Sequence, residues 1–218
     1  MHFSKSDKET PVEGLDTHMM MIENDVFIGR NQEIEEFKEF IANNKANKRI
    51  LHFYGTGGVG KTFLLQAFHR LTKANADTIY LHLDSEDFFQ SPSVLAGQII
   101  TMLEAAINYS NKCVSFSPTT MNHCFRLLRQ AAETHRIIVA VDTYEKMENL
   151  DRWFREFFLR QLPGNISVIL AGRQSLTGPW IESPSWRKLT KQVEISSFDE
   201  EQTREYLFNA GISREDTM

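Results

Sequence analysis

The sequence predicts an α/β fold: a three-layer sandwich in which a central parallel sheet of five strands lies between helices. Apolar runs rich in β-branched residues alternate with amphipathic helical patterns along the chain, which is typical of a parallel sheet covered on both faces. A glycine-rich loop follows the first apolar run and precedes a helical pattern. The composition agrees, because 41% of the 218 residues are hydrophobic and 24% are charged, the balance of a globular domain.

The expected elements follow one another in a regular order. Asn31 is a candidate N-cap for the first helix, and the glutamates that follow it suit the helix dipole. Strands are expected at residues 49–54, 78–83, 137–141, 166–171 and 193–195. Further helices are expected at residues 63–71, 94–108, from 118 onward, and 150–162. The run at 137–141 is wholly apolar, as in a strand that is buried on both faces.

Aromatic residues mark two segments in the second half of the chain. The expected helix at 150–162 carries four of them, which should form one buried stripe: Trp153, Phe154, Phe157 and Phe158. Trp180 and Trp186 lie in what we expect to be a long loop before the last strand. They either pack within that loop or form a surface for a partner.

Residues 55–62 read Gly-Thr-Gly-Gly-Val-Gly-Lys-Thr and match the phosphate-binding pattern G-x-x-x-x-G-K-[ST]. The loop lies between an expected strand and an expected helix, which is the context that the pattern requires. Its backbone N–H groups and the helix N-terminus would then point at phosphate oxygens. Lys61 is expected to reach the β- and γ-phosphates, and the Thr62 hydroxyl to bind Mg²⁺. This predicts the P-loop NTPase form of the sandwich; the alternative is a glycine turn followed by a chance Lys-Thr.

Two later strands end in residues that suit the same chemistry. Asp142 follows the buried run 137–141, where a P-loop enzyme places the acid that holds the Mg²⁺ water shell; the alternative is a turn cap. Glu145 could polarise a water for attack on the γ-phosphate, or it is an exposed loop acid. Arg173 follows the strand at 166–171 and would sense a γ-phosphate through charge-assisted hydrogen bonds, or it is a surface arginine.

With these residues in place, the chain resembles the bacterial type of the STAND class of signal-transduction ATPases, a branch of the AAA+ superfamily. Residues 27–30 resemble the glycine-arginine motif that the class carries at its adenine pocket. Residues 55–62 are similar to its Walker A motif, residues 138–145 to its Walker B motif, and residues 170–173 to its sensor-one strand. Residues 195–212 are similar to the start of its helical lid domain. The resemblance covers about residues 25–212.

The resemblance implies that ATP or ADP binds with Mg²⁺. The nucleotide-binding residues would be Phe27, Ile28, Gly29, Arg30, Gly55, Thr56, Gly57, Gly58, Val59, Gly60, Lys61, Thr62 and Phe63. The metal would be held by Thr62 and Asp142, and Glu145 and Arg173 would act in hydrolysis. Thr143 stands where many relatives have a second acid, which leaves the identity of the base open. We also find no arginine finger and no proline-bearing lid motif.

Three parts are expected along the chain. Residues 1–24 form a flexible N-terminal leader, residues 25–196 the P-loop ATPase domain, and residues 197–218 the start of a truncated helical lid domain. In the last part, Asp199 and Gln202 have the spacing of a capping box, and Gly211 can end the helix that follows.

Charge and composition limit the possible functions. The net charge of −5 and the pI of about 5.8 disfavour a broad nucleic-acid interface. The sequence shows no signal peptide and no apolar run near the roughly 20 residues of a membrane helix, and two cysteines, Cys113 and Cys124, fit reduced thiols in a cytoplasm.

The favoured hypothesis is an ATP/ADP-binding switch module with slow Mg²⁺-dependent hydrolysis, which meets protein partners or assembles with itself through regions that this chain lacks. The alternative is a DNA-processing AAA+ ATPase of initiator or loader type. A small-molecule kinase is a third hypothesis, which the glycine-arginine motif ahead of Walker A disfavours.

Overall fold

The computed structural model describes residues 28–42, 48–88, 91–107 and 119–212. The expected leader, Phe27 and Cys113 lie outside these ranges. The chain divides into two compact units, one of residues Arg30–Phe198 and one that combines Met1–Gly29 with Asp199–Met218.

The unit of residues 30–198 is built on a five-stranded sheet, and all of its neighbouring strands are parallel. Its strands are β1 (Ile50–Tyr54), β2 (Thr78–Asp84), β3 (Arg136–Asp142), β4 (Ser167–Gly172) and β5 (Thr190–Glu194). Their order across the sheet is β2-β3-β4-β1-β5. Strands β3 and β4, which are apolar apart from their end residues, lie inside the sheet, as their composition predicts. The predicted fold class is therefore confirmed.

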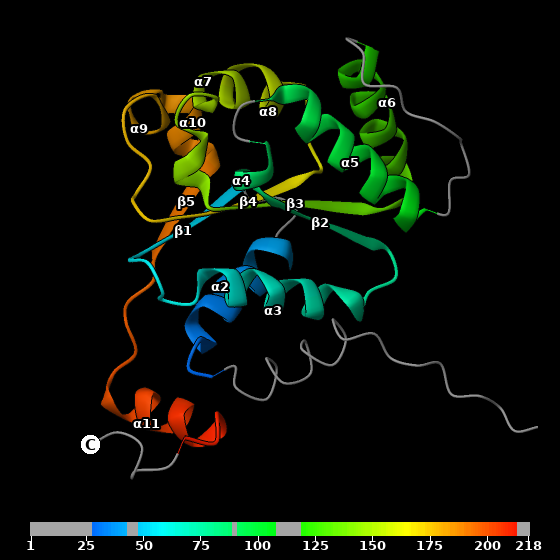
Figure 1. Cartoon of the computed structure of the whole chain (residues 1–218). Helices are drawn as coiled ribbons and strands as arrows, with labels where there is room; N and C mark the ends of the chain where they lie inside the picture. The colour runs from blue at the N-terminus through cyan, green and yellow to red at the C-terminus, as the bar shows by residue number, and fades with distance from the viewer. Residues whose placement is uncertain (1–27, 43–47, 89–90, 108–118, 213–218) are drawn as a thin grey trace, which may run out of the picture. The chain divides into compact units, whose positions relative to one another are not determined.

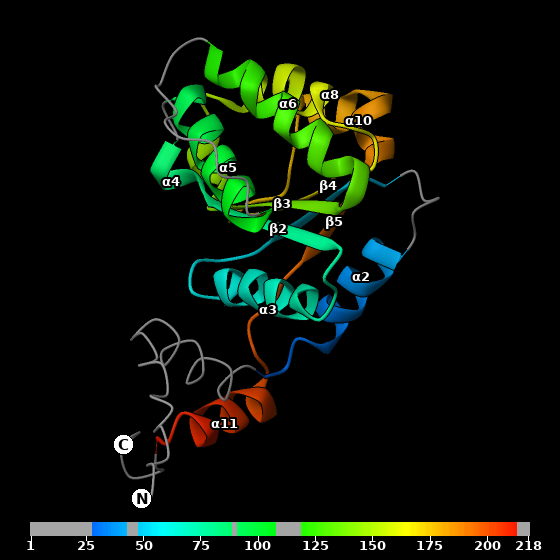
Figure 2. The same cartoon turned by 90° about the vertical axis from the view of Figure 1, so that its right-hand side faces the viewer.

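Helices cover both faces of the sheet (Figures 1 and 2). On one face lie α2 (Asn31–Ala42) and α3 (Lys61–Lys73). On the other lie α5 (Pro92–Ala106), α6 (Thr119–Thr134), α8 (Leu159–Gln161) and α10 (Pro184–Leu189). The short helices α4 (Ser85–Phe88), α7 (Asp151–Trp153) and α9 (Pro179–Glu182) complete the unit. Among the described residues, no helix is both long and apolar enough to span a bilayer.

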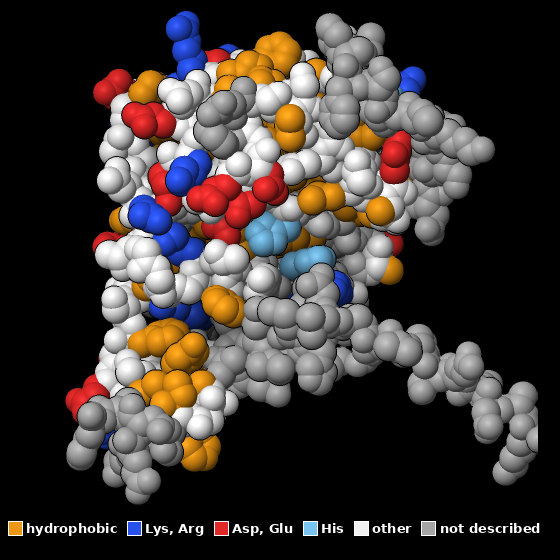
Figure 3. All heavy atoms as spheres, in the orientation of Figure 1, with side chains coloured by type: hydrophobic (Ala, Val, Ile, Leu, Met, Phe, Trp, Pro, Cys, Tyr) orange, Lys and Arg blue, Asp and Glu red, His pale blue; other side chains and the backbone are white. Residues whose placement is uncertain are grey.

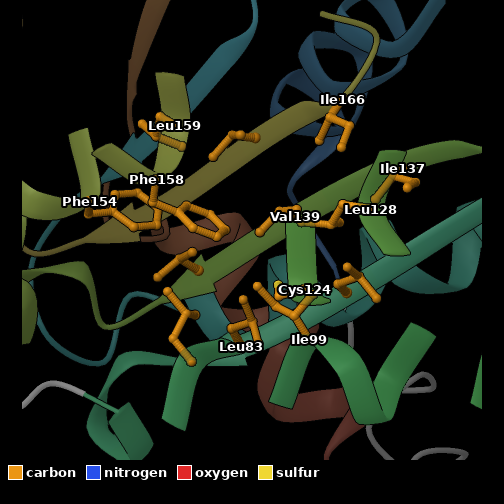
Figure 4. Packing of buried hydrophobic residues seen from close by; sticks show 14 of the residues in the cluster. Leu83, Ile99, Cys124, Leu128, Ile137, Val139, Phe154, Phe158, Leu159 and Ile166 are labelled. Carbon is orange, nitrogen blue, oxygen red and sulfur yellow. The ribbon is translucent and has the colours of Figure 1, made fainter. Parts of the chain in front are cut away.

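The hydrophobic core lies on both sides of the sheet. On the side of α5 and α6, buried residues of the strands and helices form one continuous cluster (Figure 4). On the side of α2 and α3, Phe37 stacks on Phe68 with ring centroids 4.2 Å apart, and Phe68 contacts Phe53 of β1 at 5.3 Å. Cys124 of α6 is a buried free thiol, and burial raises its pKa to about 12. These aromatic and aliphatic contacts fix the strands that carry the candidate site.

The segment expected as one regular helix at 150–162 is interrupted. Between α7 and α8 the chain makes a π-helical turn, Phe154–Phe158. Phe154 and Phe158 are fully buried, but Phe157 is 44% exposed, so the expected four-residue buried stripe is wrong at this position. A π turn carries more residues per turn than an α-helix, so residues three apart no longer share a face and Phe157 rotates away from Phe154.

The segment before the last strand is helical rather than a loop. Trp180 lies in α9 and Trp186 in α10, both are nearly buried, and their rings meet edge to face at 5.5 Å. They pack in the core, so the partner-surface alternative is wrong for them. Strand β5 also begins earlier than expected, because its polar residues suit an edge strand with one exposed side and hide the strand from a search for apolar runs.

The described part of the second unit contains α11 (Glu200–Asn209). Asp199 and Gln202 form the expected capping box. Gly211 has a φ of +71°, and the N–H groups of Gly211 and Ile212 donate to the carbonyls of Phe208 and Leu207. This is the Schellman pattern, and it ends the helix as the glycine predicts.

Candidate nucleotide-binding site

The glycine loop joins the carboxyl end of β1 to the first turn of α3. Gly58 and Gly60 have φ of +80° and +92°, values that side chains disfavour. A Cβ added to Gly55 would lie 2.4 Å from the carbonyl oxygen of Ile195, so only glycine fits there. The Gly55 N–H donates to the Gly172 carbonyl of β4 at 3.2 Å. The loop is thus fixed against the ends of two neighbouring strands.

Lys61 lies at the start of α3 and folds back over the loop. Its Nζ donates to the carbonyl oxygens of Gly55 and Thr56, both at 2.8 Å. Burial lowers the pKa of Lys61; the charges of Glu145 and Asp142 act in the opposite direction. Lys61 therefore shares its electrostatic environment with Asp142 at the tip of β3 and Glu145 in the turn after it.

Asp142 is the last residue of β3 and is nearly buried. Its Oδ1 accepts a hydrogen bond from the Thr143 N–H at 2.7 Å. The Ser85 hydroxyl of α4 donates to the Asp142 carbonyl at 2.9 Å and also to the Thr143 carbonyl. Asp142 thus does cap its own turn, and it is held from β2's side of the sheet at the same time.

Glu145 and Arg173 meet across the tips of β3 and β4. Glu145 lies in a short 3₁₀ turn, Tyr144–Met147, and its Oε1 pairs with the Arg173 Nε at 2.9 Å. Its Oε2 accepts a hydrogen bond from the Arg173 backbone N–H at 3.1 Å. The Arg173 guanidinium also lies near the glycine loop, because a Cβ added to Gly57 would be 3.9 Å from its Cζ. Neither residue is isolated on the surface.

The strand order explains why these groups converge. Because β3 and β4 are neighbours and β1 follows directly, parallel pairing brings the carboxyl ends of all three to one edge of the sheet. Figure 3 shows acidic and basic side chains gathered close together on the face around α4, where β2 ends. The edge therefore offers a cation, Lys61, and carboxylates within one small region.

Arg30 contributes to the loop through a contact that its motif did not suggest. Its guanidinium is buried and donates to the Val59 carbonyl at 2.7 Å and to the Ser196 carbonyl at 2.9 Å. It also pairs with Glu33 and stacks over the ring of Phe198. In this position Arg30 supports the glycine loop. Ile28 and Gly29, expected at the same pocket, belong to the other compact unit, and Phe27 is outside the described residues.

Five of the other expected residues are exposed. Thr56, Gly57 and Gly58 present their backbone to solvent, and Thr62 and Phe63 are exposed on the first turn of α3. No atom of the described residues lies within 4 Å of a Cβ added to Gly58 or Gly60, so these residues leave the outer side of the loop open. An anion can approach the loop from this side, and Lys61 would turn from the Gly55 and Thr56 carbonyls toward it.

Sequence reasoning missed three side chains at this edge: His52, Ser85 and Tyr144. His52 lies in β1 and is fully buried; burial lowers its pKa to about 4, and its Nδ1 lies 3.2 Å from the Gln192 Oε1. Since that oxygen can only accept, the neutral ring donates from Nδ1. Burial, and then the charge of Asp151, raise the pKa of Tyr144 well above its usual range. A polar residue inside an apolar strand run was the available signal for His52.

Comparison with known families and structures agrees with this geometry. A family model described as an AAA domain matches residues 44–178, more than half of the chain. The chain belongs to this AAA family. The predicted AAA+ P-loop ATPase is thereby confirmed at this level, as a nucleotide-binding AAA+ module. No curated protein matches the chain.

Solved structures of similar fold include ORC and Cdc6 proteins. The AAA chain is similar to Drosophila ORC bound to DNA, with 18% identity, a TM-score of 0.61, and coverage of 88% of this chain and 49% of that one. It is similar to Cdc6p from Pyrobaculum aerophilum, with 14% identity, a TM-score of 0.60, and coverage of 83% and 48%. It is also similar to the ORC2 protein of Aeropyrum pernix in ADPNP-ADP complexes, with 13% identity, a TM-score of 0.58, and coverage of 85% and 53%. The chain spans about half the length of these structures, and at such identities the likeness shows the fold.

Proposed function

We propose that the chain is the ATP/ADP-binding switch module of a signal-transduction ATPase of the STAND class, with slow Mg²⁺-dependent hydrolysis. The observation that carries the proposal is the ion pair between Glu145 and Arg173, which lies beside the glycine loop. It places a candidate base and a candidate phosphate sensor in contact with each other and next to the phosphate-binding backbone.

The residues at the sheet edge fit a nucleoside triphosphate with Mg²⁺. The open glycine loop offers backbone N–H groups to phosphates, and Lys61 supplies a cation at its mouth. In the described ranges, no three His, Cys, Asp or Glu side chains gather in a way that could hold a metal ion by themselves. Mg²⁺ commonly binds through one or two protein ligands together with phosphates and waters, and Thr62 and Asp142 would serve in this way. The metal would neutralise charge on the phosphates.

The ion pair between Glu145 and Arg173 would respond differently to ATP and to ADP. A γ-phosphate carries negative charge and would compete with Glu145 for the Arg173 guanidinium. ADP lacks that group and would leave the pair intact. A ligand changes a conformational equilibrium only through its differential interaction with the two states, and Arg173 would provide this difference.

The same pair supports slow hydrolysis. The Oε1 of Glu145 pairs with the Arg173 side chain, and its Oε2 accepts a hydrogen bond from the Arg173 backbone N–H. Glu145 must therefore be released before it can orient and activate a water. We propose further that residues 25–196 act as the ATPase domain and that α11 begins a helical lid. The capped ends of α11 make it a well-defined helix with which a lid could start.

A DNA-processing AAA+ ATPase is a second candidate. Similarity to Drosophila ORC bound to DNA and to Cdc6p favours it, whereas the net charge of −5 disfavours broad contact with phosphates. Fluorescence anisotropy with labelled duplex and single-stranded DNA, with and without ATP, separates the candidates. Salt-sensitive binding together with DNA-stimulated phosphate release would replace the switch proposal by this one.

Thermal melts test the nucleotide assignment. At 100 times its dissociation constant, ATP or ADP with Mg²⁺ should add about 2.7 kcal/mol to the free energy of unfolding, whereas GTP should add much less. Equal shifts with GTP would remove the adenine preference. No shift with any of the three nucleotides would overturn the proposal.

A further inference from the structure

Glu145 is attached to a residue whose side chain is firmly held. Tyr144 directly precedes it, is 7% exposed, and packs its ring against Phe154 and Trp180 with centroids 6.0 and 6.2 Å away. Its hydroxyl donates to the Asp151 Oδ1 at 2.7 Å. The backbone position from which Glu145 projects is therefore linked to Asp151 of α7.

Asp151 gathers donors from three separate elements. The same Oδ1 that accepts from Tyr144 also accepts from the indole Nε1 of Trp180 in α9 at 2.7 Å. Its Oδ2 pairs with the Nη2 of Arg155, a buried arginine in the π turn, at 3.4 Å. Each of these groups restrains the carboxylate, so Asp151 is a fixed point to which the Tyr144 hydroxyl is tied.

The turn between Asp142 and Glu145 needs such a restraint. Thr143 has a φ of +53° and is the only non-glycine residue with a positive φ in the described part of the chain. A side-chain-bearing residue keeps this conformation only where its surroundings over-determine it. The Ser85 hydroxyl holds the turn before Thr143, and the bond between Tyr144 and Asp151 holds it afterwards.

We infer that Asp151 is a positioning residue for Glu145, acting through the hydroxyl of Tyr144. Without this bond the 3₁₀ turn can relax, and Glu145, once released from Arg173, no longer projects from the backbone position from which it would orient water. The glycine loop lies between β1 and α3, and Lys61 is the first residue of α3, so nucleotide binding should not depend on the bond. The inference rests on the proposed hydrolysis of ATP and assigns a residue that does not itself touch the nucleotide.

Tyr144→Phe removes the hydroxyl and keeps the ring, which makes it the direct test. Under single-turnover conditions, with the protein in excess over ATP, its rate of phosphate release should fall about tenfold, since small displacements of catalytic groups are costly. Its dissociation constant for a non-hydrolysable ATP analogue should stay within about twofold of the wild-type value, because the phosphate-binding backbone is untouched.

Tyr80→Phe is the matched control. The Tyr80 hydroxyl donates to the Leu65 carbonyl at 3.0 Å, so this variant loses a comparable hydrogen bond without a link to Glu145. It should keep the wild-type rate. Asp151→Ala also removes the contacts to Trp180 and Arg155, so it should lose at least the factor that Tyr144→Phe loses. The double variant should lose no more than Asp151→Ala alone, because the Tyr144 hydroxyl then has no partner left to lose.

Several outcomes would overturn the inference. An unchanged rate in Tyr144→Phe, an equal loss in Tyr80→Phe, or a loss of analogue affinity that matches the loss of rate would each show that Tyr144 acts only in general stability. Additive losses in the double variant would show that Asp151 and Tyr144 act separately. A wild-type chain that binds the analogue and releases no phosphate would overturn the proposed hydrolysis and this inference together, and the wild-type measurement distinguishes that case from the others.

Discussion

The glycine loop and the tips of β3 and β4 make up the candidate site in two different ways. The loop is local: residues 55–61 make its turns, and its groups are backbone N–H groups and one lysine. The tips are nonlocal: Glu145 and Arg173 lie 28 residues apart and meet only because β3 and β4 are neighbours in the sheet. Binding of phosphate should therefore depend on the first region, and response to the γ-phosphate on the second.

Glu145→Gln, a change at the strand tips, should produce the largest effect of these variants, and that effect should be on phosphate release alone. A candidate base is lost while the hydrogen-bonding shape remains, so phosphate release should fall by about 10²-fold or more with nucleotide affinity retained. Steady-state phosphate release and calorimetry measure the two quantities. Glu148→Gln, an exposed acid of the same segment, is the control and should change neither. Equal rates in the Glu145 variant and the wild type would remove Glu145 from the chemistry.

His52 lies in β1, the strand that leads into the glycine loop, and its buried ring makes the stability of the fold depend on pH. Burial lowers its pKa from 6.5 to about 4, so the unfolded chain binds a proton between these values and the folded chain does not. Its contribution is therefore present above pH 6.5 and is lost as the pH falls towards 4, by roughly 3 kcal/mol at most. His52→Gln should flatten the fall in melting temperature between pH 6.5 and 4. The same slope in both proteins would show that other groups, such as His69 and His82, cause it.

Lys61→Ala tests the glycine loop. It removes the side-chain cation at the loop's mouth, a charge-assisted contact worth about 1.5–3 kcal/mol, so affinity for ATP and ADP should fall about 10- to 100-fold. The fold should persist, because Lys61 contacts loop carbonyls rather than the core. Lys73→Ala, at the far end of the same helix, is the control. Wild-type affinity in the Lys61 variant would separate the loop from the nucleotide site.

The difference between the local glycine loop and the nonlocal strand tips also explains how much of the structure the sequence could predict. Local patterns were sufficient for the strand–loop–helix unit, for the capped helix α11 and for the interior strands β3 and β4. Contacts between distant residues were beyond such patterns. The bond from Tyr144 to Asp151 and the support of Val59 by Arg30 depend on packing that no single segment encodes. The π turn at 154–158 is a tertiary adjustment of a helical pattern, which is why the exposure of Phe157 was not foreseen.

Arg173→Ala tests the central claim, that the strand tips distinguish ATP from ADP. Paired calorimetric titrations of the wild type and the variant, with ADP and with a non-hydrolysable ATP analogue, measure this directly. Arg160→Ala serves as the matched control, because Arg160 is a comparably exposed arginine that pairs with Glu156 at 2.8 Å. The account predicts that the dissociation constant of the ATP analogue rises about tenfold or more in the Arg173 variant, while that of ADP changes by less than about twofold. Equal losses for both ligands, or no loss for either, would contradict the switch.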